Sequence, residues 1–274
     1  MTDSDASRLL DDATDLVSQA AAAVLAAIAG GLDTRAKTDE SPVTRADMAA
    51  QGVLMDGLTK LLPGVPLVSE EAVDEAPAEL GHTFWLVDPV DGTKELIAGR
   101  DEYTINVALM RDGAPWLGIV AAPARGEIWR GVVGHGAEFL KLAPGRAVAH
   151  ADQRGPIHTR ARPAGRLVAA CSRSHPDPKS EALLAEFGDV IKIDCGSALK
   201  FCRVAEGAAD LYPRLGTTCE WDIAAGHAVV VAAGGAVVTP LGRPLPYGQA
   251  DKAFRVPGFV AVGDLGLLTQ LPGA

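Results

Sequence analysis

The sequence predicts a layered α/β protein of two domains, an α+β domain with an antiparallel sheet followed by an α/β domain. Three observations support this fold class. Apolar residues recur at helical spacing near the N-terminus, strand-like segments separated by turn residues fill the middle of the chain, and strands then alternate with helices. We place the boundary after a stretch without clear periodicity, so that the predicted domains cover residues 1–160 and 161–274.

Two predicted helices open the first domain. Over residues 5–28, apolar side chains recur three or four positions apart, the pattern of an amphipathic helix. Thr44-Arg45-Ala46-Asp47 has the form of a capping box, which predicts a second helix to about residue 62. Strands follow at 65–69, at 84–87 and, as an antiparallel meander broken by glycine-containing turns, over 103–140.

The second domain follows residues 142–165, which are rich in Pro, Gly, Arg and Ala. Its predicted strands are 167–171, 190–193, 209–212 and 236–238, and its predicted helices are 178–187, 197–206 and 221–233. Such alternation is typical of an α/β domain.

Composition and charge exclude several classes of function. The formal net charge is −10, whereas a nucleic-acid-binding surface needs a basic stripe, so nucleic acid is not an expected partner. No apolar run reaches the roughly 20 residues that span a bilayer, and acidic residues precede the run over 20–29, unlike a signal peptide. We therefore expect a cytoplasmic protein with no integral membrane segment and with reduced cysteines; peripheral association with a membrane stays open.

A pair of carboxylates follows the strand predicted over 84–87. Asp88 and Asp91 flank a proline, and buried charge there is costly unless something neutralises it. Gly92 and Thr93 then open a helical turn whose backbone N–H groups and hydroxyl can bind an anion. Mg²⁺ prefers oxygen ligands and binds through substrate phosphate. The segment therefore predicts a Mg²⁺-dependent phosphatase, although the same residues also suit a pair of β-turns.

Two acidic residues elsewhere in the chain favour the metal site. Glu70 follows the strand predicted over 65–69, and Asp222 stands at the start of the helix predicted over 221–233. Each has a simpler interpretation, Glu70 as a loop acid and Asp222 as a helix N-cap. Their occurrence together with the first pair favours a centre shared between the two domains.

Asp47 has two interpretations. As the acid of the capping box it needs no catalytic role. Alternatively, it acts with Thr93 to orient a water whose pKa a metal lowers from about 16 to about 7. In that scheme Asp47 holds geometry more than it accepts protons.

These motifs resemble those of the inositol monophosphatase superfamily of lithium-sensitive, Mg²⁺-dependent phosphatases. Asp88-Pro89-Val90-Asp91-Gly92-Thr93 resembles its first signature, and Trp221-Asp222-Ile223-Ala224-Ala225-Gly226-His227-Ala228 resembles its second. Finer features are similar to one branch, the 3′(2′),5′-bisphosphate nucleotidases of sulfur assimilation. The segments concerned are Ser41-Pro42-Val43-Thr44, Asp91-Gly92-Thr93-Lys94-Glu95, Ser172-Arg173-Ser174-His175, Gly196-Ser197-Ala198-Leu199-Lys200-Phe201-Cys202, Val204-Ala205-Glu206-Gly207 and Leu211-Tyr212-Pro213-Arg214.

The resemblance implies a role for each matching residue. Two or three Mg²⁺ ions would be held by Glu70, Asp88, the carbonyl of Val90, Asp91 and Asp222. Thr93 and Asp47 would be catalytic and position the attacking water. Substrate would contact Gly92, Thr93, His175, Ser197, Lys200, Arg214 and Asp222. The implied reaction is hydrolysis of adenosine 3′,5′-bisphosphate to AMP and phosphate, with 3′-phosphoadenylyl sulfate as a further candidate substrate.

Two basic residues favour a bisphosphate substrate on physical grounds. A bisphosphate needs a second anion site away from the metals, and both Lys and Arg bind phosphate. Lys200 follows Ser197 by three positions at a predicted helix start, so the two share a face, and Arg214 follows a predicted strand. Apart from the resemblance, a solvated surface cation is the favoured interpretation of each, and His175 alone is ambiguous.

Other functions remain open at this point. An inositol monophosphatase or another sugar phosphatase would use the same metals without the second anion site. A catalytically inactive nucleotide-binding regulator is disfavoured by the complete acidic set. Thr218-Cys219-Glu220 is more acidic than the approach expected before Trp221, which bears on substrate preference. The expected assembly is a monomer or a homodimer.

Overall fold

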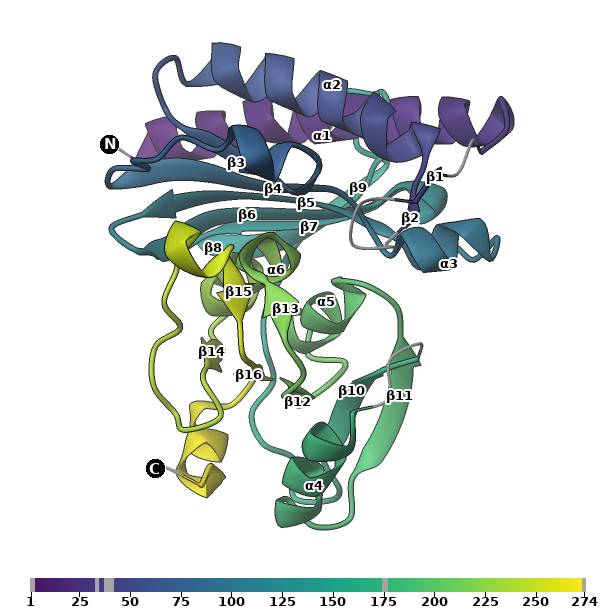
Figure 1. Ribbon diagram of the computed structural model, residues 1–274. Coiled ribbons are helices and arrows are strands. Elements are labelled where there is room, and N and C mark those ends of the chain that lie inside the picture. Colours follow the sequence, from purple (N-terminus) through teal and green to yellow (C-terminus); the bar gives the residue numbers. More distant parts are fainter. Residues whose placement is uncertain (1–2, 33–34, 37–41, 174–176, 273–274) are drawn as a thin grey trace.

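Helical layers and sheets alternate through the molecule (Figure 1). The computed structural model describes residues 3–32, 35–36, 42–173 and 177–272. Helices α1 (Asp3–Ala29) and α2 (Arg45–Leu61) cover a seven-stranded sheet, and α5 (Leu199–Ala205) and α6 (Glu220–Ala232) lie beneath it. A five-stranded sheet follows, with α4 (Pro178–Glu186) on its far side. The predicted layered α/β fold class is confirmed.

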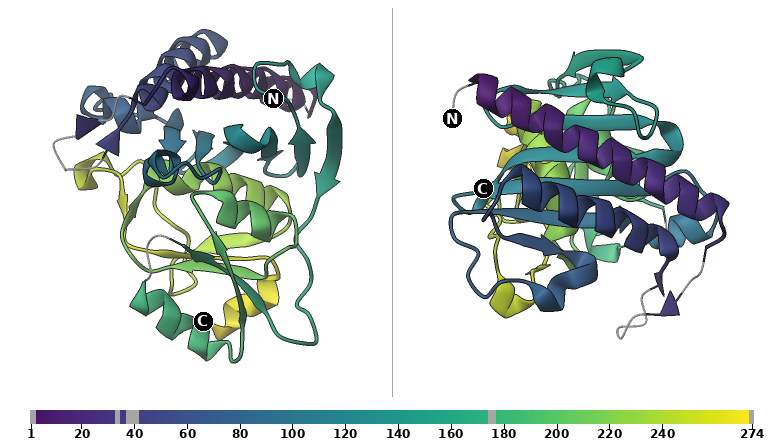
Figure 2. Two further views of the ribbon diagram at one scale, coloured as in Figure 1. Left: turned by 90° about the vertical axis from the view of Figure 1, so that its right-hand side faces the viewer. Right: turned by 90° about the horizontal axis from the view of Figure 1, so that it is seen from above.

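α1 and α2 form where the sequence predicts them and lie side by side across the large sheet (Figure 2, right view). By length and composition α1 is apolar enough to cross a membrane, a test that core helices also pass. One of its faces, including Leu9, Ala13, Val17 and Val24, is buried against α2 and the sheet. α1 is therefore a core helix of this fold.

The large sheet confirms the predicted meander. Its order is β3-β4-β5-β6-β7-β8-β9, in which β3 is parallel to β4 and every other pair is antiparallel. The strands are β3 (Leu67–Ser69), β4 (Thr83–Asp91), β5 (Thr104–Arg111), β6 (Ala114–Ala122), β7 (Glu127–Val132), β8 (Gly136–Lys141) and β9 (Gln153–Ile157). β9 escapes sequence analysis because this edge strand has no buried residue, so it lacks apolar alternation.

β4 is longer than predicted, since it continues past residue 87 to Asp91. Asp88 pairs with Asn106 and Asp91 with Thr104, so two residues of β4 face one of β5 between these pairs. This irregularity is a β-bulge, and it admits Pro89 without ending the strand.

The small sheet has the order β11-β10-β12-β16-β14. β10 is parallel to β11 and β12, whereas β16 is antiparallel to β12 and β14. The strands are β10 (Val168–Ser172), β11 (Ile191–Cys195), β12 (Leu211–Arg214), β14 (Ala236–Val238) and β16 (Phe259–Val262). Sequence analysis predicted all of them except β16, an interior strand of this sheet.

Short elements complete the described chain. The two-stranded pairs are β1 (Arg35–Ala36) with β2 (Pro42–Val43) and β13 (Thr218–Cys219) with β15 (Arg255–Val256). α3 (Thr93–Ile97) follows β4 directly. The 3₁₀ helices are η1 (Glu70–Glu75), η2 (Pro123–Arg125), η3 (Val148–His150), η4 (Ala250–Lys252) and η5 (Leu265–Gln270).

α6 packs between the two sheets and against a distant part of the chain. A Cβ at Gly118 of β6 would lie 2.2 Å from the carbonyl oxygen of Ala225, so only glycine allows this approach. On another side, His227 Nδ1 lies 2.8 Å from the hydroxyl oxygen of Tyr247, and burial lowers the pKa of His227 to about 4.

One apolar cluster runs from the large sheet through α5 and α6 to the small sheet. A second cluster joins α1 and α2 to the large sheet, and a third joins α4 and η5 to the small sheet. Because the core between the sheets is continuous, the division of the chain at residue 160 remains a prediction.

Candidate metal centre

The bulge in β4 turns two carboxylates toward α6. Along β4, Phe84 and Leu86 face the cluster shared with α6, and Asp88 continues this face by the alternation of a strand. Asp88 is only 1% exposed, and its Oδ1 accepts a hydrogen bond from the backbone N–H of Val90 at 3.1 Å. Its Oδ2 has no hydrogen-bond partner among the described residues.

Glu70, Asp88 and Asp222 each place a carboxylate oxygen within 4.8 Å of the others. They come from the start of η1, the bulge of β4 and the first turn of α6. The structure thus brings together three predicted ligands that are far apart in the sequence. Asp91 lines the same pocket, as do Val90, Gly92 and Thr93.

The carboxylates of this cluster repel one another. Burial is the main cause that raises the pKa of Asp88 well above its usual range, and Glu70, Asp91 and Asp222 add to it. Burial and Asp222 raise the pKa of Asp91 to about 6, while Lys200 and Arg214 act in the opposite direction. A bound cation would relieve this repulsion.

The donor set fits a hard divalent cation. Each candidate ligand offers an oxygen atom, as Mg²⁺ requires, and one oxygen of the buried Asp88 is left unpaired by the described protein groups. The side chains of Glu70, Asp88, Asp91 and Asp222, with the carbonyl of Val90, could hold such an ion.

Gly92 and Thr93 form the turn predicted between β4 and α3. Gly92 has φ +90°, a left-handed conformation, and a Cβ there would lie 2.0 Å from the Ser197 hydroxyl oxygen. Glycine is therefore required on both conformational and steric grounds. The hydroxyl of Thr93 lies 3.2 Å from Asp47 Oδ1 and 3.2 Å from the Val90 carbonyl oxygen.

Asp47 is both a helix cap and a neighbour of the site. Its Oδ2 accepts hydrogen bonds from the backbone N–H of Thr44 at 2.8 Å and from the Thr44 hydroxyl at 2.6 Å, which completes the predicted capping box. Its Oδ1 faces Thr93. The two interpretations of Asp47 are thus compatible, because each uses a different oxygen.

Asp222 is the third residue of α6, as Asp47 is the third residue of α2. Its Oδ2 accepts hydrogen bonds from the Thr218 hydroxyl and from the backbone N–H of Cys219, the latter at 3.0 Å. Glu220, fully buried, accepts hydrogen bonds from the backbone N–H groups of Gly248 and Gln249 at 2.7 and 2.8 Å. The acidic approach noted in the sequence therefore anchors α6 to a distant segment.

Lys200 and Arg214 line the same pocket as the carboxylates. The second anion site itself, predicted at these two cations and away from the metals, remains a prediction. Lys200 is 2% exposed and donates to the carbonyl oxygens of Ser197 at 2.6 Å and Cys195 at 3.3 Å. Burial lowers its pKa to about 8.

Ser197 connects the pocket across the two sheets. It is one of the few non-glycine residues with positive φ, +47°, and its hydroxyl lies 2.9 Å from the Asp91 carbonyl oxygen and 2.8 Å from that of Glu102. This contact was not predicted. Glu102 in turn accepts from the Gly196 N–H at 3.0 Å.

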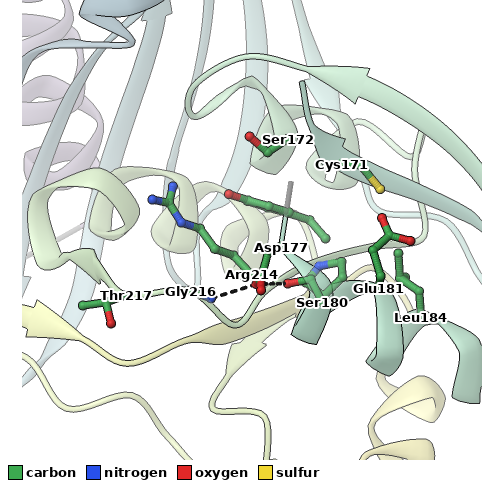
Figure 3. A pocket seen from close by; sticks show the side chains of 11 residues that line it. Cys171, Ser172, Asp177, Ser180, Glu181, Leu184, Arg214, Gly216 and Thr217 are labelled. Carbon is green, nitrogen blue, oxygen red and sulfur yellow. Dashed lines mark hydrogen bonds between the residues drawn. The ribbon is translucent and has the colours of Figure 1, made fainter. Parts of the chain in front are cut away.

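A second cavity, of about 260 Å³, adjoins this pocket through Ser172 and Arg214 (Figure 3). Its other walls include Tyr212 of β12 and Leu184 of α4. Asp177 fixes its rim by accepting hydrogen bonds from Ser180 and from the Gly216 N–H. His175, a predicted substrate contact, lies outside the described residues.

Four residues near the site were not predicted from the sequence. Glu102 and Glu220 bind backbone N–H groups of distant segments, and Thr104 and Asn106 lie on β5 opposite the two aspartates. None belongs to a local motif. Only the unusual Thr218-Cys219-Glu220 approach gave a signal.

A cluster of carboxylates beside a turn that can bind phosphate, held between two sheets, defines a metal-dependent phosphatase. Comparison with known proteins agrees with this class. The chain belongs to the inositol monophosphatase family, whose model matches residues 5–257.

Individual relatives carry more specific names. The chain is 41% identical over 256 residues to a protein of Escherichia coli K12 named 3′(2′),5′-bisphosphate nucleotidase CysQ, a match that covers 92% of this chain and 98% of that protein. A relative of the same name from Shigella flexneri is 40% identical over 264 residues, with the same coverage.

Solved structures agree in fold. CysQ from Bacteroides thetaiotaomicron, a bacterial member of the inositol monophosphatase family, is similar with a TM-score of 0.76 and 32% identity over 94% of this chain and 97% of that one. An inositol monophosphatase from Anabaena gives a TM-score of 0.74 at 22% identity over 97% and 94% of the two chains, which shows the shared fold alone.

Proposed function

We propose that this protein is a cytoplasmic, Mg²⁺-dependent 3′(2′),5′-bisphosphate nucleotidase that hydrolyses adenosine 3′,5′-bisphosphate to AMP and phosphate. The observation that carries the proposal is the joint lining of one pocket by the acidic group of Glu70, Asp88 and Asp222 and by two cations, Lys200 and Arg214. The names of relatives at about 40% identity support the same reaction.

Within the proposal, each residue has a chemical task. Glu70, Asp88, Asp91, Asp222 and the Val90 carbonyl hold Mg²⁺, which when bound polarises phosphate oxygens and lowers the pKa of water. Thr93 and the Gly92 turn bind the reacting phosphate. The Thr93 hydroxyl, which lies 3.2 Å from both Asp47 Oδ1 and the Val90 carbonyl oxygen, would accept a hydrogen bond from the attacking water and so orient it. Asp47 keeps this hydroxyl in place.

The second phosphate is assigned to Lys200 and Arg214. Both are largely removed from solvent, so a phosphate there meets cations whose field is weakly screened. The cavity lined by Tyr212 and Leu184 adjoins Arg214 and offers an apolar wall to a nucleoside. The resemblance to the 3′(2′),5′-bisphosphate nucleotidases adds 3′-phosphoadenylyl sulfate, which carries a 5′-phosphosulfate in place of the 5′-phosphate, to the proposed substrates.

Phosphate release over a panel of substrates tests the proposal. We expect adenosine 3′,5′-bisphosphate to be hydrolysed in the presence of Mg²⁺ and not after its removal by chelation. Asp91→Asn should abolish turnover and leave the fold intact, whereas Asp112→Asn, at an exposed turn, should be neutral. Near-wild-type turnover by Asp91→Asn would refute the metal assignment, and Mg²⁺-dependent phosphate release from any substrate would eliminate an inactive regulator.

A comparison of two substrates separates the nucleotidase from an inositol or sugar phosphatase. Lys200→Met keeps most of the side-chain volume and removes the charge. We expect it to raise the KM for adenosine 3′,5′-bisphosphate by about 10-fold or more, the effect of one lost charge-assisted contact. Adenosine 3′-monophosphate, which lacks the second phosphate, serves as the control. Equal losses for both substrates, or preferred turnover of inositol phosphate by the wild type, would contradict the assignment.

A further inference from the structure

Buried polar atoms without hydrogen bonds gather beside the carboxylates. Within the described part of the chain, they are Asp88 Oδ2, Thr104 Oγ1 and both amide atoms of Asn106, with Trp85 Nε1 the other such atom. Thr104 and Asn106 are 0% exposed. Since an unpaired buried polar group is costly, three neighbouring side chains with unpaired atoms need an explanation.

The register of β4 and β5 places these side chains together. Asn106 is directly opposite Asp88, and Thr104 is directly opposite Asp91. Residues opposite each other in an antiparallel pair share a face of the sheet, with Cβ atoms about 5 Å apart. Ala108 and Met110 continue this face of β5 and belong to the cluster shared with α6. Thr104 and Asn106 therefore lie on the face from which Asp222 approaches.

Asn106 and Thr104 each lie opposite a proposed metal ligand, Asp88 and Asp91 respectively. A cation at Asp88 and Asp91 would keep several waters if it were Mg²⁺. Those waters and the reoriented carboxylates would supply the partners that Thr104 and Asn106 lack.

Thr14 shows what a purely structural buried threonine is like in this protein. It is also 0% exposed, but its hydroxyl donates to the Leu10 carbonyl oxygen at 2.6 Å and accepts from Arg130 Nη1 at 2.9 Å. Thr104 is equally buried and has no such partners among the described residues.

We propose that Asn106 and Thr104 are positioning residues of the metal centre, which hydrogen-bond its carboxylates and the waters of the bound cation. The inference rests on the proposed function, because it assumes that a cation binds between Asp88 and Asp91. It adds two residues of β5 to a site otherwise made from β4, η1 and α6.

Thermal melting with and without Mg²⁺ tests the proposal in the full-length protein. Thr104→Val and Asn106→Leu keep the side-chain volume and remove the polar atoms. Without the ion, we expect their melting temperatures to equal or exceed that of the wild type, because no hydrogen bond is lost. With Mg²⁺, the rise in melting temperature should be smaller than in the wild type, and the Mg²⁺ dissociation constant from calorimetry about 10- to 100-fold higher.

Two variants serve as controls. Thr14→Val should lower the melting temperature without the ion and keep the full Mg²⁺-induced rise. Thr104→Ser restores a hydroxyl and should rescue Mg²⁺ affinity. If Asn106→Leu does not fold, the two variants at Thr104 decide the matter alone.

The outcomes separate this inference from the function on which it rests. A wild-type Mg²⁺ response in Thr104→Val and Asn106→Leu would overturn the positioning role and leave the proposed function standing. A wild-type protein that does not bind Mg²⁺ at all would overturn the metal centre, and the positioning role with it.

Discussion

The helices α2 and α6 each carry an aspartate of the site in their first turn, and the hydrogen bonds that hold the two aspartates differ. In each, the third residue is an aspartate whose Oδ2 accepts a hydrogen bond from the backbone N–H of the N-cap residue. Asp47 is held by its own cap residue, Thr44, which supplies two donors. Asp222 is held by the weaker cap Cys219 and by the Thr218 hydroxyl.

The start of α6 also depends on a segment more than twenty residues away. Glu220 binds the N–H groups of Gly248 and Gln249, and its own N–H donates to the carbonyl oxygen of Phe254 at 2.8 Å. Asp47, by contrast, takes both of its capping hydrogen bonds from Thr44, three residues earlier in the chain. A local motif thus orients Asp47, whereas contacts with a distant segment support the turn that carries Asp222, so the position of Asp222 depends on tertiary packing.

The substitution Asp222→Asn should give the largest effect that separates the two helices. The amide can still accept from Cys219, but it brings no charge to Glu70 and Asp88. We expect turnover and Mg²⁺ affinity to fall by more than about 100-fold, since changes to groups that only orient a ligand already cost about 10- to 100-fold. The melting temperature without metal should not fall. Asp251→Asn, an exposed acid on η4, is the matched control and should be neutral.

Asp47→Asn should cost less activity and some stability. One amide oxygen cannot accept from both Thr44 and Thr93, so the cap and the site compete for it. We expect turnover to fall about 10- to 100-fold and the free energy of unfolding by about 1 kcal/mol. Thr44→Ala should lower stability by a similar amount with little loss of turnover. If both variants lost activity equally, Asp47 would act only as a cap.

Glu220→Gln tests the hydrogen bonds that join the start of α6 to Gly248 and Gln249. The amide can accept one of the two backbone N–H groups and faces the other with its own N–H, so the free energy of unfolding should fall by about 2 kcal/mol. Mg²⁺ affinity should weaken several-fold, because Asp222 follows in the same turn. Urea denaturation and calorimetry measure the two quantities. A loss of stability with unchanged Mg²⁺ affinity would show that Glu220 supports the fold but not the site.

His227 should make the packing of α6 sensitive to pH. Its pKa is about 4 in the folded protein against about 6.5 when unfolded, so the unfolded chain binds the extra proton as the pH falls. Stability is therefore lost between pH 6.5 and 4, by up to about 1.4 kcal/mol per pH unit. The raised pKa of Asp91 makes the folded protein more stable as the pH falls, which opposes the effect of His227. This contribution of Asp91 is the same in the wild type and in His227→Gln, so it cancels when the two proteins are compared. Equal slopes for the two proteins would contradict the buried neutral histidine.

The same contrast explains what the sequence could predict. Thr44 and Asp47 stand in one contiguous motif, and the carboxylates of β4 stand in another, so their local structure follows from neighbours in the chain. The extension of β4 through Pro89 was not predicted, because pairing with β5 decides it. β16 was missed because it is a run of only four buried apolar residues, whose periodicity does not identify a strand, and β9 because an exposed edge strand carries no apolar pattern.

Residues that act across the fold were the hardest to find. Asn106 and Thr104 read as ordinary members of a buried strand, and only the register with Asp88 and Asp91 gives them a role. Lys200 and Arg214 were found as cations, but their closeness to the carboxylates depends on how the sheets face each other. Distance along the chain contains no information of that kind.

The helices packed between the two sheets have a consequence for how the molecule comes apart. Because α5 and α6 contribute to a core that both sheets share, neither sheet can keep its buried face without them. Loss of one half of the molecule would expose the other, so equilibrium denaturation should be a single cooperative event rather than two successive ones. Far-ultraviolet circular dichroism, which reports on backbone secondary structure, and tryptophan fluorescence, which reports on the packing around the tryptophans, should then give coincident midpoints.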